Sequence, residues 1–316
     1  MKTHELTAHA GARPAAPPWW RRAAPVHGAA SSPGHARPGA AALRRFLRNP
    51  AAAAGALALL AIALLALAAP ALYPGDPLDM VAEPLLWPGQ DAHYWLGTDA
   101  LGRDLAAGIT HGARASLLIG LAAAAVGLSL GTVAGACAGY FGGRVDAALG
   151  RVMELFQATP SFLFMLVVVA IAPPTVGVIA LAIGATSWPT VARLARAEFR
   201  TLRERDFVLA ARSLGYGHGR IIFREILPNA LPPLIVAASV MVAQAILMES
   251  ALSFLGCGDP NRVSWGSLIG SGREMLRTAW YLTAIPGGAI AVAVLALNMV
   301  GDGLNEALDP RLEGRP

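Results

Sequence analysis

One serine between two glycines is the first residue whose surroundings suggest covalent chemistry. Gly127, Ser129 and Gly131 match the G-x-S-x-G pattern of serine hydrolases. That pattern works on a strand–turn–helix elbow with Asp and His partners, because the serine hydroxyl needs a base. Here it lies in a long apolar stretch with no acid or histidine nearby. We therefore predict that this serine is not a nucleophile.

The sequence patterns that usually bind ATP or metals are also absent. Of the 25 basic residues, Lys2 is the only lysine, so no phosphate-binding loop with its lysine can form. Cys137 and Cys257 form no C-x-x-C pair, and the seven histidines are scattered. We predict no catalytic residue, no metal site and no cofactor bound by this chain. If ATP drives the protein, another polypeptide hydrolyses it.

Two polar side chains lie inside apolar segments, where such residues are candidates for a substrate pathway. Glu249 would suit a substrate amine, but it could also reach the membrane interface or pair with an arginine. Asn298 is a second candidate, although hydrogen bonding between helices would explain it equally well.

The composition places these residues in a membrane protein. Apolar residue types make up 55% of the 316 residues and charged types only 14%, whereas soluble domains carry about 25% charge. Five long stretches lack charge, and one of them is divided by Pro173 and Pro174, which predicts a helical hairpin. The predicted fold is all-α with six membrane-spanning helices, roughly at 51–72, 115–138, 155–172, 175–192, 230–250 and 280–300.

Arginine placement predicts the orientation of these spans. Twenty basic residues fall on the side of both termini and the loop at 193–229, and four fall on the other side. By the positive-inside rule, both termini and that loop face the cytoplasm. Residues 1–43, rich in Ala, Pro and Arg, are predicted to be a disordered cytoplasmic tail. A cleaved signal peptide is the weaker alternative, because the charged lead is too long.

The second span carries a ridge of glycines at four-residue spacing: Gly127, Gly131, Gly135 and Gly139. Small residues let helix backbones approach closely in lipid. The ridge therefore predicts tight packing against a neighbouring helix.

The loop at 193–229 is far longer than a connection between two spans requires. Asp206 to Leu214 is predicted to form a short helix with Gly215 as its C-cap. A second helical piece, Arg220 to Leu227, is expected to end at Pro228, Pro232 and Pro233. An apolar stripe on the short helix is predicted to bind a partner or to pack on the protein's own spans; its residues are Phe207, Ala210, Ala211 and Leu214. Nucleic-acid binding is disfavoured beside a bilayer.

The segment at 73–112 lies on the opposite side of the membrane. Asp99, Arg103 and Asp104 are predicted to form either a docking surface for a binding protein or a self-contained ion-pair cap.

Five ordered segments together resemble the dipeptide/oligopeptide-type permeases of bacterial ABC transporters. The loop resembles the family's cytoplasmic "EAA" loop at Ala210, Ala211, Gly215, Leu227 and Pro228, but has Leu209 where that family has Glu. The other segments are L-G-T-D-A-L-G-R-D from Leu96, Y-F-G-G-R-V-D from Tyr140, E-S-A-L-S-F-L-G from Glu249, and P-G-G-A-I with N-M-V-G-D-G-L-N-E-A-L-D-P-R ending at Arg311.

The resemblance implies an ATP-driven importer subunit in the bacterial inner membrane. Residues 44–112 would hold the first span and a periplasmic segment, and residues 113–312 the permease domain with 193–229 as its coupling loop. Expected partners are a second permease, two ATPase subunits that use ATP and Mg, a periplasmic solute-binding protein and membrane lipid. Alternatives are an importer of nickel chelates or glutathione from the same family, a stand-alone secondary carrier, or a membrane-embedded enzyme.

Overall fold

The computed structural model describes residues 38–308, and no strand is assigned within that range. The all-α prediction is therefore confirmed. Five helical runs are long and apolar enough to cross a membrane, and a bent pair of helices brings the number to six. The long helices are α2 (Pro50–Leu72), α3 (Leu105–Phe141), α6 (Val176–Leu202), α9 (Leu227–Phe254) and α11 (Tyr281–Leu308).

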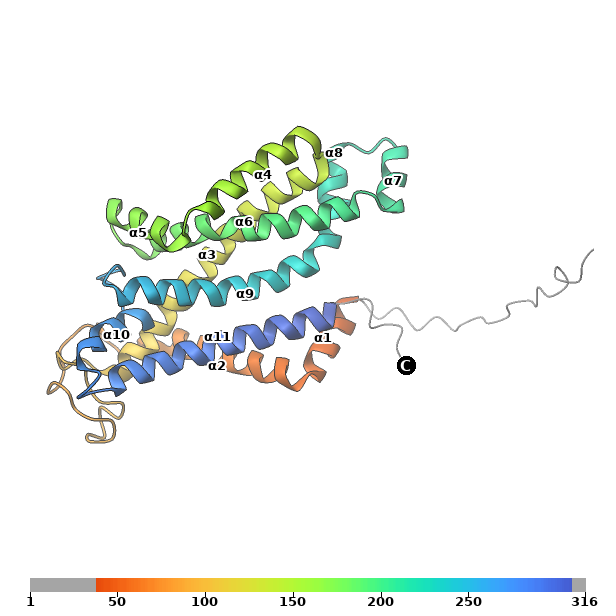
Figure 1. Cartoon of the computed structure of the whole chain (residues 1–316). Helices are drawn as coiled ribbons and strands as arrows, with labels where there is room; N and C mark the ends of the chain where they lie inside the picture. Colours follow the sequence, from red (N-terminus) through yellow and green to blue (C-terminus); the bar gives the residue numbers. More distant parts are fainter. Residues whose placement is uncertain (1–37, 309–316) are drawn as a thin grey trace, which may run out of the picture.

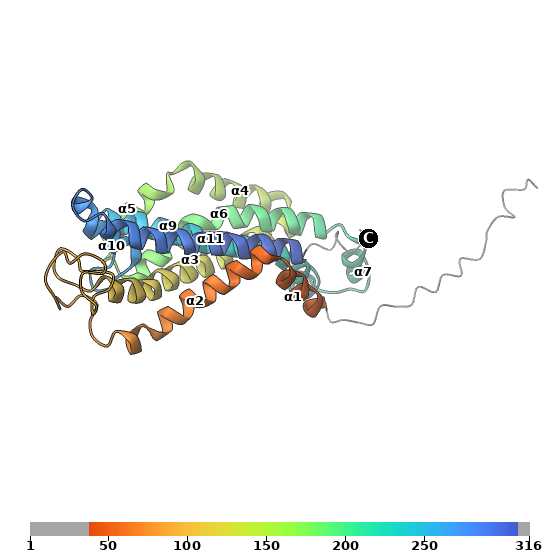
Figure 2. The same ribbon diagram turned by 90° about the horizontal axis from the view of Figure 1, so that it is seen from below.

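The long helices run between two distinct ends of the bundle (Figure 1). One end, called the α7 end below, carries α1 (Pro38–Arg48), α7 (Asp206–Ser213) and α8 (His218–Arg220). The other, the α10 end, carries α10 (Trp265–Gly272) and the long segment between α2 and α3. Figure 2 shows α1 and α2 along one side of the bundle and α4 (Gly143–Ala158) along the opposite side.

The glycine ridge of α3 lies directly against α6. A Cβ atom added at Gly131 would sit 2.5 Å from Val191 Cβ, and one added at Gly135 would sit 2.6 Å from Ala195 Cβ. Real Cβ atoms do not approach this closely, so only glycine permits this helix separation. The predicted packing role is confirmed. α3 also begins ten residues before the predicted 115, because Asp104 accepts a hydrogen bond from Ala106 N–H and caps it.

The prediction of one straight third span at 155–172 is wrong. The chain forms α4 and then α5 (Ser161–Ile171), bent by 81° at the break. Pro160 causes the break, since it has no N–H to donate and forces Thr159 into an extended conformation (φ −89°, ψ 127°). The hairpin at Pro173 and Pro174 is confirmed, because α5 ends at Ile171 and α6 begins at Val176.

The prolines after the coupling loop do not end a helix, contrary to expectation. A π-helical segment, Ile221–Ile226, leads from α8 directly into α9, and Pro232 and Pro233 lie inside α9. In the wider π turn, Leu227 N–H donates to Ile222 C=O, which leaves room beside Pro228. The loop predicted at 193–229 also begins later than expected, because α6 continues to Leu202.

Part of the tail predicted to be disordered at 1–43 is helical. α1 begins at Pro38, so the last residues of that range are helical. The rest of the tail, 1–37, lies outside the described residues.

Candidate functional site

α7 is a separate short helix at the α7 end of the bundle (Figure 1). It ends at Ser213, and Gly215 follows in the left-handed region with φ 75°. Tyr216 N–H then donates to Ala211 C=O at 3.1 Å and Gly215 N–H to Arg212 C=O at 2.9 Å, which closes the helix end. Both the short helix and the capping role of Gly215 agree with the prediction.

The two faces of α7 have different surroundings. Val208 is 0% exposed and Ala211 is buried, and both belong to a core cluster with Phe199 of α6. The opposite face exposes Phe207, Ala210 and Leu214, the last at 71% exposure. The prediction that Ala211 belongs to the exposed stripe is wrong, because the helix needs one face to attach itself to the bundle. The free apolar face remains available to a partner.

Leu227 and Pro228 belong to the first turn of α9 and not to α7. Leu227 is partly buried against the same core cluster, and Pro228 is exposed at the first turn of α9. In the described structure they support the end of α9, so they are not part of the apolar surface formed by α7.

Tyr140, at the end of α3, joins the helices of this region, and sequence reasoning missed it. Its side chain is buried, and its hydroxyl lies 2.8 Å from His218 Nδ1. The Arg212 guanidinium of α7 lies 5.7 Å from the centre of its ring. The longest helix of the bundle is thereby fixed to both α7 and α8.

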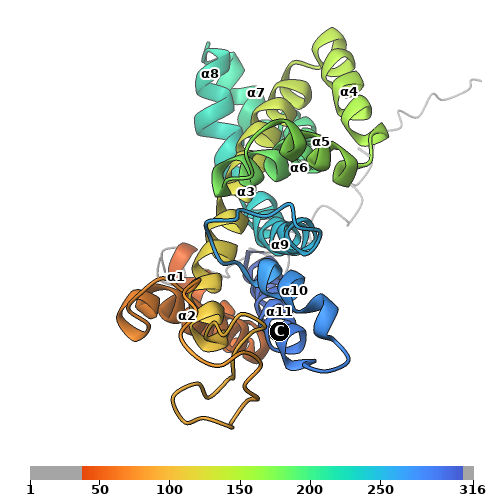
Figure 3. The same cartoon turned by 90° about the vertical axis from the view of Figure 1, so that its left-hand side faces the viewer.

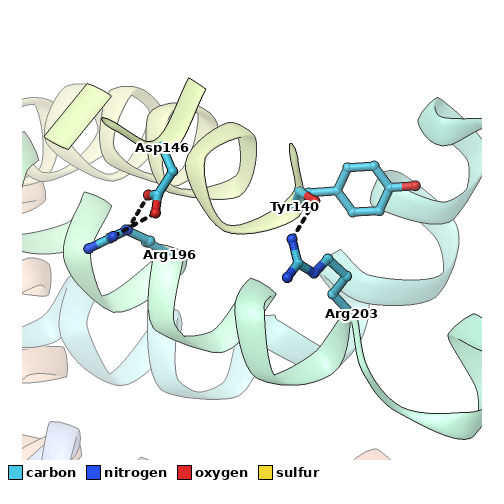
Figure 4. Close-up of polar contacts among 4 residues, drawn as sticks. All are labelled: Tyr140, Asp146, Arg196 and Arg203. Carbon is cyan, nitrogen blue, oxygen red and sulfur yellow. Dashed lines mark hydrogen bonds and ion pairs between the residues drawn. The ribbon is translucent and has the colours of Figure 1, made fainter. Parts of the chain in front are cut away.

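Two arginines, Arg196 of α6 and Arg203 directly after it, make further contacts in this region (Figure 4). Arg203 Nη1 donates to the Tyr140 carbonyl oxygen at 3.1 Å. Arg196 forms a bidentate ion pair with Asp146 of α4, with Nη2 donating to Oδ2 at 2.7 Å. Bidentate pairs fix orientation as well as distance. These two contacts join α4 to α6 and the end of α3 to the end of α6.

A cavity of about 520 Å³ lies between α7 and the end of α3. Leu209, where the resembling family has Glu, lines it together with Arg203 and Arg212. A carboxylate at this position would lie near two guanidinium groups. Leu209 is 48% exposed, so this chain has an accessible apolar side chain where the resembling family has an acid.

Asp99 and Asp104, two of the three residues predicted for docking at the α10 end, have local structural roles. Asp99 is buried and accepts hydrogen bonds from Leu101 N–H and Arg103 N–H. Asp104 caps α3, and burial raises the pKa of its carboxyl group. Among the described residues no ion pair joins Asp99 or Asp104 to Arg103. The predicted ion-pair cap is therefore absent there, and the two acids instead accept hydrogen bonds from backbone N–H groups.

Glu249 is enclosed between α9 and α10. It is 1% exposed, and its Oε1 accepts hydrogen bonds from Ser253 Oγ at 2.7 Å and from Ser264 Oγ at 2.6 Å. Ser264 is also the N-cap of α10. Glu249 therefore joins α10 to α9, and its side chain is buried in this conformation. Asn298, in contrast, is exposed on α11 and has no hydrogen bond within residues 38–308.

Two family models match the chain over consecutive regions. Residues 96–314 match the model described as binding-protein-dependent transport system inner membrane component. Residues 37–88 match the N-terminal transmembrane domain of oligopeptide transport permease C.

Individual relatives align over nearly the whole chain. The di/tripeptide transport system permease protein DppC of Pseudomonas aeruginosa is 41% identical over 85% of this chain and 90% of its own. The dipeptide transport system permease protein DppC of Alkalihalophilus pseudofirmus is 37% identical over 86% and 90%. An inward-facing structure of the MetNI methionine ABC transporter has a similar fold, with a TM-score of 0.54 at 15% identity, covering 64% of this chain and 96% of that one.

Proposed function

Because this chain belongs to the family of binding-protein-dependent transport system inner membrane components, we propose that it is the permease subunit of an ATP-driven importer of di- or oligopeptides. Family membership makes it a multi-pass membrane transport component and not an enzyme. The peptide cargo is supported by relatives named as di/tripeptide and dipeptide permeases at 41% and 37% identity.

The observation that carries the ATP-driven mechanism is the two-faced helix α7. Val208 and Ala211 attach it to the bundle, while Phe207 and Leu214 remain free. The chain has no lysine for a phosphate-binding loop, so the motor belongs to a partner. We infer that an ATPase subunit binds the free face, and that closure of an ATPase pair displaces α7. Since Arg212 of α7 lies over the Tyr140 ring of α3, and Arg203 joins Tyr140 to the end of α6, this displacement shifts the bundle between its outward and inward states.

The complete importer in this proposal has five polypeptides, of which the two permeases lie in the bacterial inner membrane. This chain pairs with a second permease, two ATPase subunits bind at the α7 end, and a periplasmic binding protein delivers the peptide at the α10 end. The arginine-rich loop supports this orientation, because basic residues collect on the cytoplasmic side.

A cysteine at Ser213 tests the orientation. Ser213 ends α7 and is exposed. In a background without Cys137 and Cys257, Ser213→Cys is expected to react with a membrane-impermeant maleimide in inside-out vesicles only. Labelling in intact spheroplasts would place α7 in the periplasm and would refute the arrangement.

Reconstitution tests the function itself. The four membrane and ATPase subunits are placed in proteoliposomes with ATP inside, and the purified binding protein and a radiolabelled dipeptide outside. Uptake is expected only when ATP and the binding protein are both present. Uptake of a labelled nickel chelate or of labelled glutathione under the same conditions, without uptake of the dipeptide, would refute the proposed peptide cargo. Uptake by this chain alone would identify a secondary carrier.

A further inference from the structure

Two amide side chains occupy the exposed surface of the bundle at membrane depth. Gln244 of α9 and Asn298 of α11 are both exposed, and neither has a hydrogen bond within the described residues. The exposed serine and threonine hydroxyls of a helix can bond to its own carbonyls, but an amide group has two donors and an acceptor to satisfy. In hydrocarbon each unmade hydrogen bond is costly. This surface therefore does not face lipid tails.

The two amides lie at nearly the same depth on neighbouring helices. α9 and α11 run in opposite directions and meet at Ser239 and Gly301, where an added Cβ would touch the Ser239 hydroxyl. Gln244 is five residues from this contact toward the α10 end, and Asn298 is three residues from it in the same direction. At about 1.5 Å per residue these displacements are about 7.5 Å and 4.5 Å. The amides thus differ by about 3 Å in depth.

Both amides also point to the same side of the bundle. Figure 3 shows α9 between α6 and α11, with α3 crossing beside it. α9 meets α3 through Val242 and Ile246, and at about 100° per residue Gln244 lies roughly on the opposite side of the helix. On α11, Ala296 and Val300 face α2, and Asn298 is directed away from that contact. The amides therefore share the open side of the bundle between α6 and α11.

The chemistry of this side fits a peptide backbone. Within the spanning part of α9, the only charged residue is Glu249, which is enclosed, and α11 has none before Asp302. Peptides differ in side-chain charge but share backbone N–H and C=O groups, and a neutral amide can donate to one and accept from the other. We propose that Gln244 and Asn298 line the translocation path and hydrogen-bond the backbone of the passing peptide. This inference rests on the proposed function and names the feature of the substrate that is recognised.

Water accessibility gives the first test, using the assembled importer. Gln244→Cys and Asn298→Cys are introduced into the background without Cys137 and Cys257, with Leu64→Cys on α2 as the control. Leu64 is 56% exposed and lies in an uncharged, lipid-length helix. A water-soluble methanethiosulfonate is expected to label positions 244 and 298 but not 64, and a saturating dipeptide with its binding protein is expected to slow that labelling. If positions 244 and 298 are labelled no faster than position 64, or are not protected by peptide, the inference fails.

Transport kinetics give the second test. Gln244→Leu and Asn298→Leu each remove one side-chain hydrogen-bonding group, so the KM for dipeptide uptake is expected to rise about three- to tenfold. Copurification of all subunits should be unchanged. Asn298→Asp should slow acidic dipeptides relative to basic ones, a selectivity that a purely structural role would not produce.

The outcomes separate this inference from the proposed function. If the unaltered importer does not take up peptides, the proposed function fails. If it does, but the leucine variants transport normally, the proposed hydrogen bonds to the peptide backbone are refuted. If the leucine variants instead release the second permease, the amides belong to the subunit interface and the inference is overturned.

Discussion

Replacing Gly135 by leucine is expected to prevent the chain from accumulating as a folded bundle. Gly135 faces the Ala192 carbonyl, and a Cβ there would be 2.6 Å from Ala195 Cβ. A larger side chain must push α3 away from α6, and overpacking of this kind costs about 1–3 kcal/mol or more even for small insertions. The measurement is the yield of monodisperse protein in mild detergent and its thermal unfolding midpoint.

A second glycine provides the matched control. Gly150 lies inside α4, and no atom is within 4 Å of an added Cβ. Gly150→Ala should leave yield and stability unchanged or raise stability by up to about 1 kcal/mol, because alanine favours helix, whereas Gly135→Ala should lower both. Equal behaviour of the two alanine variants would show that α3 and α6 do not pack as described.

The second large effect is expected at the free face of α7. Leu214→Asp places a charge where an ATPase is proposed to bury an apolar side chain. Burial of a leucine contributes about 1.5–3 kcal/mol, so ATPase binding should weaken by at least about tenfold. Because Leu214 is 71% exposed, the permease itself should fold normally. The readouts are ATPase copurification and ATP-dependent peptide uptake.

Leu209→Glu is the matched control, since it places an acid on the same helix. Its carboxylate would lie near Arg203 and Arg212 in the adjoining cavity, and this residue type matches the resembling family. We expect transport within about twofold of the unaltered importer, since exposed ion pairs change stability by about 1 kcal/mol or less. Should Leu214→Asp retain full ATPase binding, or Leu209→Glu lose it to the same extent, the apolar face would not be the docking surface.

A buried position such as Ala211 is a poor place for this experiment. Ala211 packs with Val208 in the core cluster at the α7 end. A charged side chain there would disturb the attachment of α7 as well as any contact with a partner. The structure thus separates substitutions that test binding from those that test folding.

The amino-acid sequence by itself determined the membrane class, the positions of most spans and the existence of α7. These features depend on local signals: the length of uncharged stretches, the four-residue spacing of glycines, and Gly215 at a position that requires positive φ. A helix in lipid must satisfy its backbone hydrogen bonds within itself, so its presence is encoded within a single segment. Local signals do not determine the ends of these helices, because proline breaks a helix at Pro160 but lies within one at Pro232.

Only the tertiary structure decided which side chains meet. Asp146 and Arg196 are 50 residues apart, and Tyr140 and His218 are 78 residues apart. Their contacts depend on which helices become neighbours and on how each is rotated, which no single segment specifies. The same holds for the buried face of α7, the enclosure of Glu249, and the position of Gln244 and Asn298 on one side of the bundle. Composition determines whether a segment can form a membrane-spanning helix, and packing between distant segments determines which neighbours each face of that helix contacts.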